Sequence, residues 1–194
     1  VLQRLWQPWL MPAEDTASAP SFRILDIGSG PGSMALAAAH LLSERSKPLR
    51  CDVTALDMAP QLLDDFRQLS AALPKRVRIH TKRCDVSTAT NLRQLPKQRY
   101  QLILIGNLLN ELKGGLPARA AFLRTVCEQF LDAQGVVCIV EPGNQNSSRA
   151  LMSLRDEFCE ATTTLAPCLH DHLCPLISHG RDWCHTERTW QLPN

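Results

Sequence analysis

The sequence lacks a strong net charge, a long hydrophobic run and an internal repeat. Its 21 Lys and Arg residues nearly balance 19 Asp and Glu residues, so the net charge of +2 implies no strongly basic surface overall. The longest apolar runs are only as long as a strand, and no N-terminal stretch has the charged, apolar and small-residue parts of a signal peptide. We therefore expect an intracellular protein that does not bind a membrane.

The length and composition are those of one α/β domain with shorter flanking parts. With 194 residues, 44% of them hydrophobic, the chain can fill a complete core. The first ten residues have a helical pattern, the next eleven resemble a linker, and the sequence stops soon after Trp190, which indicates a piece of a longer protein. We predict three parts: residues 1–21, an N-terminal helical fragment and linker; residues 22–162, the α/β domain; and residues 163–194, a segment rich in Cys and His.

Strand-like and helix-like patterns alternate along the central part of the chain. We predict strands at about 22–28, 51–57, 77–82, 100–106 and 136–141, and helices at about 33–45, 60–72, 117–131 and 147–161. This alternation predicts a doubly wound parallel sheet with helices on both faces.

The junction between the first strand and the first helix is the most informative stretch. It has the sequence LDIGSGPG from Leu25 to Gly32, and its three glycines remove the Cβ atoms that would keep a ligand away. A dinucleotide-binding turn has the spacing G-x-G-x-x-G, but Ser33 stands where its third glycine is needed. The spacing D-x-G-x-G-x-G, which starts at Asp26, favours a nucleotide-like cofactor without a pyrophosphate. A glycine turn that serves only helix packing is the alternative.

This spacing resembles motif I of the class I S-adenosylmethionine-dependent methyltransferases, which implies a Rossmann-like fold and S-adenosylmethionine as the cofactor. Asp57 ends the second strand, where a carboxylate can accept hydrogen bonds from both ribose hydroxyls. The family places an acid beside the adenine amino group, here Asp85, although an Asp after a strand is also an ordinary turn or N-cap residue. Complete members carry two further strands that are not evident here. The predicted cofactor-binding residues are Asp26, Gly28, Ser29, Gly30, Gly32, Asp57, Met58, Asp85 and Asn107.

The residues after the fourth strand are the candidates for catalysis. A ligand of an open parallel sheet lies across the carboxyl ends of the strands, so we expect Asn107 near the transferred methyl group, with Asn110 and Glu111 beside it. Enzymes that methylate exocyclic amines of bases have two prolines and an aromatic here, and this chain has neither. Cytosine C5 enzymes need a nucleophilic Cys, and the pair Pro167-Cys168 lies far from this strand. The alternative role for Asn107 is a plain helix N-cap.

Clustered Cys and His residues follow the last predicted helix. Three cysteines and four histidines fall within residues 168–185, and disulfides are rare in an intracellular protein, so the cluster indicates metal ligands. The spacing differs from the short C-x2-4-C of common zinc folds. Iron-sulfur clusters tolerate irregular spacing but require four ligands. Unliganded thiols in an irregular loop are the alternative.

Five stretches of the chain form a more specific combination than any one of them alone. They are Asp26–Gly32, Asn107–Leu112, Glu141–Gly143, Cys168-x5-Cys174-Pro175 and Trp183–His185. Together they resemble a narrower family, the methyltransferase-like proteins of the small ribosomal subunit, known from mitochondria and with bacterial relatives. The resemblance implies a protein that engages small-subunit ribosomal RNA during assembly, in the bacterial cytoplasm or the mitochondrial matrix, with no membrane or DNA partner expected.

The same resemblance implies a four-iron, four-sulfur cluster, with zinc as the alternative metal. Its thiolate ligands correspond to Cys168, Cys174 and Cys184. The family takes its fourth ligand from a later cysteine. Either that portion is missing here or another side chain substitutes, from the set His170, His172, His185 and Cys159.

Three functions are compatible with these features. The first is an S-adenosylmethionine-dependent methyltransferase that acts on small-subunit ribosomal RNA. The second is a non-catalytic assembly factor that keeps the cofactor pocket and uses the cysteine loop as a clip on RNA, and the missing catalytic motif favours it. The third, a small-molecule methyltransferase, is disfavoured by the cysteines.

The one dense basic stretch, Lys75–Arg83, includes the third predicted strand. A stripe of cations can follow a phosphate backbone. The third strand of a doubly wound sheet is also an edge, where Lys and Arg prevent pairing with other chains, and we favour this second interpretation.

Overall fold

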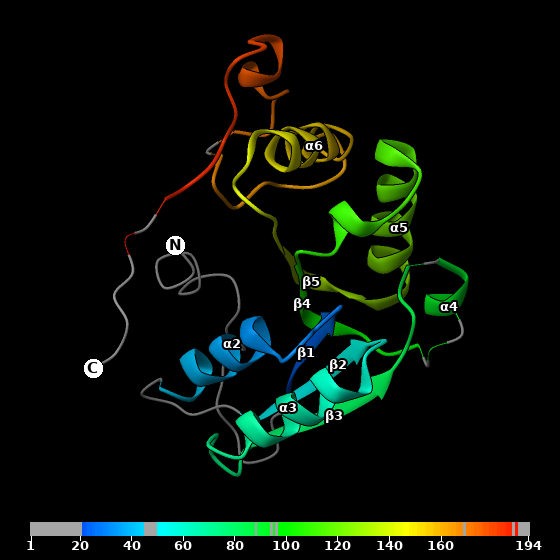
Figure 1. Cartoon of the computed structure of the whole chain (residues 1–194), viewed down its shortest axis with the longest axis vertical. Helices are drawn as coiled ribbons and strands as arrows, with labels where there is room; N and C mark the ends of the chain where they lie inside the picture. The colour runs from blue at the N-terminus through cyan, green and yellow to red at the C-terminus, as the bar shows by residue number, and fades with distance from the viewer. Residues whose placement is uncertain are drawn as a thin grey trace.

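The computed structural model describes residues 21–44, 50–87, 89–93, 95, 97–168, 170–187 and 189. The predicted N-terminal helical fragment, nearly all of the linker after it, and Trp190 lie outside these residues. The described chain is built on a five-stranded sheet in the order β3-β2-β1-β4-β5, with every neighbouring pair parallel (Figure 1). The strands are β1 Phe22–Ile27, β2 Cys51–Asp57, β3 Val77–Arg83, β4 Tyr100–Gly106 and β5 Leu131–Val140.

Helices cover both faces of this sheet, which confirms the doubly wound prediction. Helices α2 and α3 pack on one face, whereas α5 and α6 pack on the other, with the short α4 beside α5 (Figure 1). The helices are α2 Ser33–Ser43, α3 Pro60–Ser70, α4 Ala89–Arg93, α5 Gly115–Phe130 and α6 Gln145–Asp156, with 3-10 turns η1 Leu109–Glu111 and η2 Pro175–Ser178.

Strand β1 is buried on both faces, as its run of apolar residues predicts. Ile24 belongs to the hydrophobic cluster under α2 and α3, which also contains Phe66. Leu25 and Ile27 belong to the opposite cluster, with Phe130 of α5. The central strand therefore joins the two halves of the core and fixes the turn that follows it.

Strand β5 and helix α6 differ from their predicted bounds. Strand β5 begins at Leu131, directly after α5, rather than at 136. Helix α6 begins at Gln145 and ends at Asp156, whereas a helix over 147–161 was expected. Its start is set by Asn144, whose side chain accepts a hydrogen bond from the Ser147 backbone N–H at 3.0 Å and so acts as the N-cap.

The strand order places the candidate site. It reverses between β1 and β4, and ligands of open α/β sheets bind at such a switch point, outside the carboxyl ends of the strands. The glycine turn after β1 and Asn107 after β4 lie at this point. None of the helices in the described part of the chain has the length and apolar character that crossing a bilayer requires.

Candidate cofactor-binding site

The glycine turn is held against the end of β2 by backbone hydrogen bonds. The N–H groups of Gly28 and Ser29 both donate to the Leu56 carbonyl, at 2.8 and 2.9 Å, and the Gly32 N–H donates to the Ser29 carbonyl at 2.9 Å. These bonds fix the turn before any ligand binds. The predicted residues Gly28, Ser29 and Gly32 are therefore part of one preformed loop.

Two glycines of this turn differ in what faces them. Gly30 has φ 52° and an added Cβ would meet nothing within 4 Å, so the space in front of it is open. Gly32 has φ 89° and its added Cβ would lie 2.5 Å from the ring of Phe66. Gly30 thus leaves room for a ligand, whereas Gly32 allows the start of α2 to pack against α3. The packing alternative accounts for Gly32 but not for Gly30.

Asp57 links the turn to the start of α3. One carboxylate oxygen accepts a hydrogen bond from the Gly30 N–H and the other from the Ala59 N–H, both at 2.8 Å. A carboxylate has about four lone-pair sites, so each oxygen retains capacity for a further donor such as a ribose hydroxyl. Met58, beside it, is 64% exposed and offers an apolar surface at the same rim.

Asp26 is the most unusual group of the site. The residue is only 2% exposed, and its Oδ2 atom has no hydrogen-bond partner. Burial raises the pKa of Asp26 to about 7, against a backbone hydrogen bond from Ala35 that lowers it, and the nearby Asp57 raises it further. A buried acceptor without a donor is costly unless a ligand supplies one.

Asp85 occupies the turn that follows β3. Its side chain accepts a hydrogen bond from the Ser87 N–H at 2.9 Å. Hydrogen bonds from the Ser87 side chain and then from this N–H lower the pKa of the Asp85 carboxyl. The structure therefore shows the turn role that the sequence allows. The contact of Asp85 with adenine stays a prediction.

Asn107 lies at the end of β4 in the left-handed region, with φ 52°. This backbone conformation is uncommon for a residue other than glycine. The N-cap of the η1 turn is Leu108, so Asn107 does not have the N-cap role that was the alternative. Its N–H donates to the Val140 carbonyl at 2.8 Å and its side chain is exposed. The next residue, Leu108, packs against Gly28, so Asn107 lies at the same rim as the glycine turn.

Glu141 is a site residue whose role was not predicted, although the stretch Glu141–Gly143 is part of the family resemblance. Its carboxylate accepts hydrogen bonds from the Leu109 N–H at 2.8 Å and from the Asn110 side-chain amide. Burial raises the pKa of Glu141 against these bonds. Glu141 thereby fixes the η1 turn and occupies the side-chain amide of the candidate Asn110. The other candidate, Glu111, is exposed to solvent. An acid directly after the fifth strand was the available signal.

The cysteine-containing segment is attached to α6 by two arginines and an aspartate. Arg149 donates to carbonyls of the segment, among them that of Asp182 at 2.7 Å. Arg155 donates to the carbonyls of His170 and His172. The Asp156 carboxylate accepts a hydrogen bond from the Cys174 N–H at 3.0 Å. The segment therefore takes its shape from α6.

The predicted metal ligands gather near one another without forming a coordination set. All eight cysteines are free thiols. Burial raises the pKa of the Cys184 thiol, and Cys168 and Cys174 lie close enough to raise it further. Among the described residues, however, no group of three or more Cys, His, Asp or Glu side chains is arranged to hold a metal ion. The three thiols would therefore have to move closer together to hold a metal ion.

Comparison with solved structures gives the class of this fold. The DszA carbon methyltransferase matches with a TM-score of 0.50 and 17% identity, over 67% of this chain and 31% of that chain. The methyltransferase CalH in complex with SAH matches with a TM-score of 0.48 and 20% identity, over 62% of this chain and 32% of that chain. A putative S-adenosyl-L-methionine-dependent methyltransferase of Methanococcus maripaludis matches with a TM-score of 0.43 and 21% identity, over 73% of this chain and 57% of that chain. The chain thus spans less than two thirds of each of these structures.

The fold is that of a class I methyltransferase-like α/β protein, as the glycine turn predicts. A family model described as "Mitochondrial small ribosomal subunit Rsm22" matches residues 13–191. The chain belongs to this family, which confirms the resemblance found in the sequence. No curated protein matches the chain.

Proposed function

We propose that the protein binds S-adenosylmethionine and acts on, or binds, small-subunit ribosomal RNA during ribosome assembly. The observation that carries the cofactor assignment is the buried Asp26 carboxylate with an unpartnered oxygen, near the end of β1 and directly before the turn in which Gly30 faces open space. The family to which the chain belongs supports the small ribosomal subunit as the partner. The corresponding location is the mitochondrial matrix in a eukaryote or the cytoplasm in a bacterium.

The residues of the site match the chemical groups of this cofactor. S-adenosylmethionine supplies an electrophilic methyl group, and it also carries an ammonium group, two ribose hydroxyls and an adenine. Asp26 supplies an acceptor suited to the ammonium group and Asp57 acceptors suited to the hydroxyls. Met58 and Asp85 are assigned to adenine, and Asn107 to the side of the methyl group.

A non-catalytic assembly factor is the second candidate, and the position of Asn110 favours it. The Asn110 amide is engaged by Glu141 and so is not free to align an acceptor nitrogen. Asn107 is exposed at the rim, but the proline and aromatic residues that usually orient a base are absent after it. Cofactor binding and methyl transfer must therefore be tested separately.

Isothermal titration with S-adenosylmethionine tests the pocket. Asp57→Asn should weaken binding about tenfold to a hundredfold, because hydrogen bonds to a charged acceptor contribute about 1.5–3 kcal/mol each. Asp132→Asn, at the opposite edge of the sheet, is the matched control and should bind as the parent does. Absence of heat at high cofactor concentration contradicts the proposal. Transfer of a labelled methyl group to small-subunit RNA then separates enzyme from assembly factor.

We further propose Cys168, Cys174 and Cys184 as thiolate ligands of an iron-sulfur cluster, on the strength of the family resemblance and of their proximity. Protein reconstituted anaerobically with iron and sulfide should be brown, with broad visible absorbance. Cys168→Ser should lose this colour, whereas Cys127→Ser, in α5, should keep it. A colourless protein with stoichiometric zinc contradicts the assignment.

A further inference from the structure

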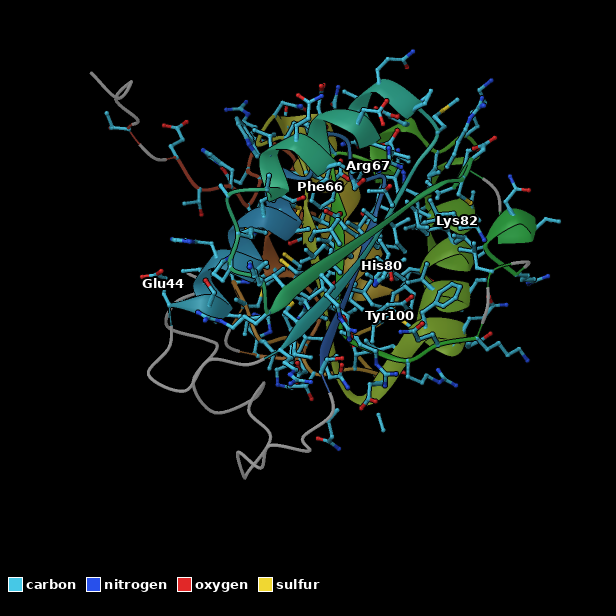
Figure 2. The ribbon with its side chains drawn as sticks, turned by 90° about the horizontal axis from the view of Figure 1, so that it is seen from below. Glu44, Phe66, Arg67, His80, Lys82 and Tyr100 are labelled. Carbon is cyan, nitrogen blue, oxygen red and sulfur yellow. The ribbon has the colours of Figure 1, made fainter. Side chains whose placement is uncertain are left out.

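The outer strand β3 presents a row of polar and basic side chains on one face. Val77 and Ile79 are half-buried and pack toward α3, whereas Arg78, His80 and Lys82 are exposed on the opposite face. Alternate residues of a strand are about 6.6 Å apart, close to the separation of successive phosphates in an extended nucleic-acid strand. Figure 2 views this edge of the sheet, with His80 and Lys82 along β3.

The cations of this row are only partly neutralised. Arg78 makes two hydrogen bonds to Asp52 of β2, from Nε at 2.6 Å and from a terminal nitrogen at 2.9 Å, and its side chain remains 64% exposed. Lys82 and Arg83 form no ion pair within the part of the chain that the structure describes. Two positive charges at the end of the strand therefore lack a carboxylate partner.

The row ends at the rim of the candidate cofactor site. Arg83 is paired in register with Asp57, and its Nε donates to the Met58 carbonyl at 3.3 Å. The Cys84 N–H donates to the Asp57 carbonyl at 2.9 Å. Charges that only protect a sheet edge can lie anywhere along it. The two unpaired charges, Lys82 and Arg83, instead lie at the end of β3 next to Asp57 and Met58, the residues assigned to ribose and adenine.

We propose that the exposed basic side chains of β3 bind the phosphate backbone of a single-stranded RNA segment at the rim of the cofactor site. Arg78, His80 and Lys82 lie on one face of the strand, and Arg83 is its last residue and turns toward Met58; the four are named here the β3 basic residues. This inference rests on the proposed function, because the ribosomal family makes RNA the expected polyanion. Arg78, His80 and Lys82 follow the backbone along the strand. Arg83 marks the point where the RNA reaches the cofactor rim.

The test measures binding of a fluorescein-labelled single-stranded fragment of small-subunit ribosomal RNA by anisotropy, at salt concentrations from about 50 to 200 mM. The variant Lys82→Gln/Arg83→Gln removes the two unpaired charges. The matched control Arg50→Gln/Lys97→Gln removes two exposed charges that precede β2 and β4, at the amino-terminal ends of the strands and so away from the cofactor rim. The charge-preserving variant Lys82→Arg/Arg83→Lys tests whether charge or local structure is responsible.

The logarithm of the affinity should fall less steeply with the logarithm of salt in the Lys82/Arg83 variant, by about 0.7 per lost phosphate contact and so about 1.4 in total. The control and the charge-preserving variant should keep the parent slope. If the parent binds RNA and the variant has the same slope, the β3 charges only protect the edge and the inference is wrong, although the proposed function stands. Displacement of the RNA by an acidic peptide of equal charge, at equal affinity, overturns it in favour of a protein partner.

Failure of the proposed function gives different results. A parent that does not bind small-subunit RNA at any salt concentration contradicts both the RNA partner and the proposed role of the β3 basic residues. A parent without heat of binding for S-adenosylmethionine, but with the expected change in salt slope, contradicts only the cofactor assignment. Thermal unfolding of each variant, which should match the parent, excludes a general loss of structure.

Discussion

At the scale of single residues, Asp26 and Asn107 define the candidate site more sharply than the glycine motif does. Asp26 is buried with a carboxylate oxygen that no protein group satisfies. Asn107 has a left-handed backbone at the carboxyl end of β4. Such strained or unsatisfied groups persist only where the surrounding structure holds them in place, and they concentrate at functional sites.

The raised pKa of Asp26 predicts how stability depends on pH. With a pKa of about 7 in the folded state and about 3.9 when unfolded, Asp26 binds its proton more tightly in the folded protein. Its stabilising contribution is present below pH 4 and is lost as the pH rises through 7, by up to about 1.4 kcal/mol per pH unit. Asp26→Asn should remove this decline, as measured by urea unfolding between pH 4 and 8. The exposed substitution Asp65→Asn should leave it unchanged, and equal slopes for Asp26→Asn and the parent contradict the prediction.

The two neighbouring glycines should respond differently to alanine. Gly32→Ala forces a methyl group against Phe66 at a positive φ and should lower the free energy of unfolding by about 2–5 kcal/mol. Gly30→Ala should cost only about 1–2 kcal/mol, because its Cβ meets open space, yet it should weaken cofactor binding at least tenfold. Chemical denaturation and calorimetric titration of the same two variants measure both quantities. Similar losses of stability in the two variants contradict this distinction.

At the scale of elements, helix α6 organises the cysteine-containing segment. The carbonyl groups of Leu176, Ile177, His179 and Asp182 all accept hydrogen bonds from Arg149. Apart from η2, the described residues after 163 form no regular secondary structure, so these bonds replace the ladder of a helix or sheet. The shape of the segment therefore depends on a few charged side chains.

Arg149→Met should release this segment while leaving the sheet folded. The substitution keeps an apolar stem but removes charge-assisted hydrogen bonds, so we expect local opening to become easier by about 2 kcal/mol or more. Limited proteolysis should then cut within residues 163–187 faster in the variant than in the parent. The control Arg67→Met, on the exposed face of α3, should not change the cutting rate. Unchanged cutting in the Arg149 variant shows that other contacts hold the segment.

At the scale of the whole molecule, the fold could be predicted well and the site only in part. Apolar strands and the turn at Gly28–Gly32 predict a doubly wound sheet, because such runs need helices on both faces. The role of Glu141 could not be predicted, because the Leu109 N–H that it binds lies 32 residues earlier and meets it only after folding. The same holds for Arg149 and Arg155, because the groups of the cysteine-containing segment that accept their hydrogen bonds are backbone carbonyls, which carry no residue-specific signal.

Ligand binding should stabilise the molecule as a unit, because the site joins β1, β2 and β4. At a concentration of S-adenosylmethionine of 100 times Kd, the free energy of unfolding should rise by about 2.7 kcal/mol. For a domain of this size the midpoint of thermal unfolding should rise by about 5–10 °C. Asp57→Asn should reduce the shift at the same cofactor concentration, and an undiminished shift in that variant contradicts the assigned role of Asp57.

The arrangement of Glu141 and α6 has a consequence for how local motions are shared. Glu141 accepts a hydrogen bond from the Leu109 N–H of η1 at the cofactor rim. Three residues later Asn144 caps α6, and Asp156 at the end of that helix accepts a hydrogen bond from the Cys174 N–H. A single short stretch of chain thus fastens both the rim and the thiols. Amide hydrogens at Leu109 and Cys174 should consequently exchange with solvent in one cooperative opening. Cofactor binding at the rim should then also slow hydrogen exchange at Cys174.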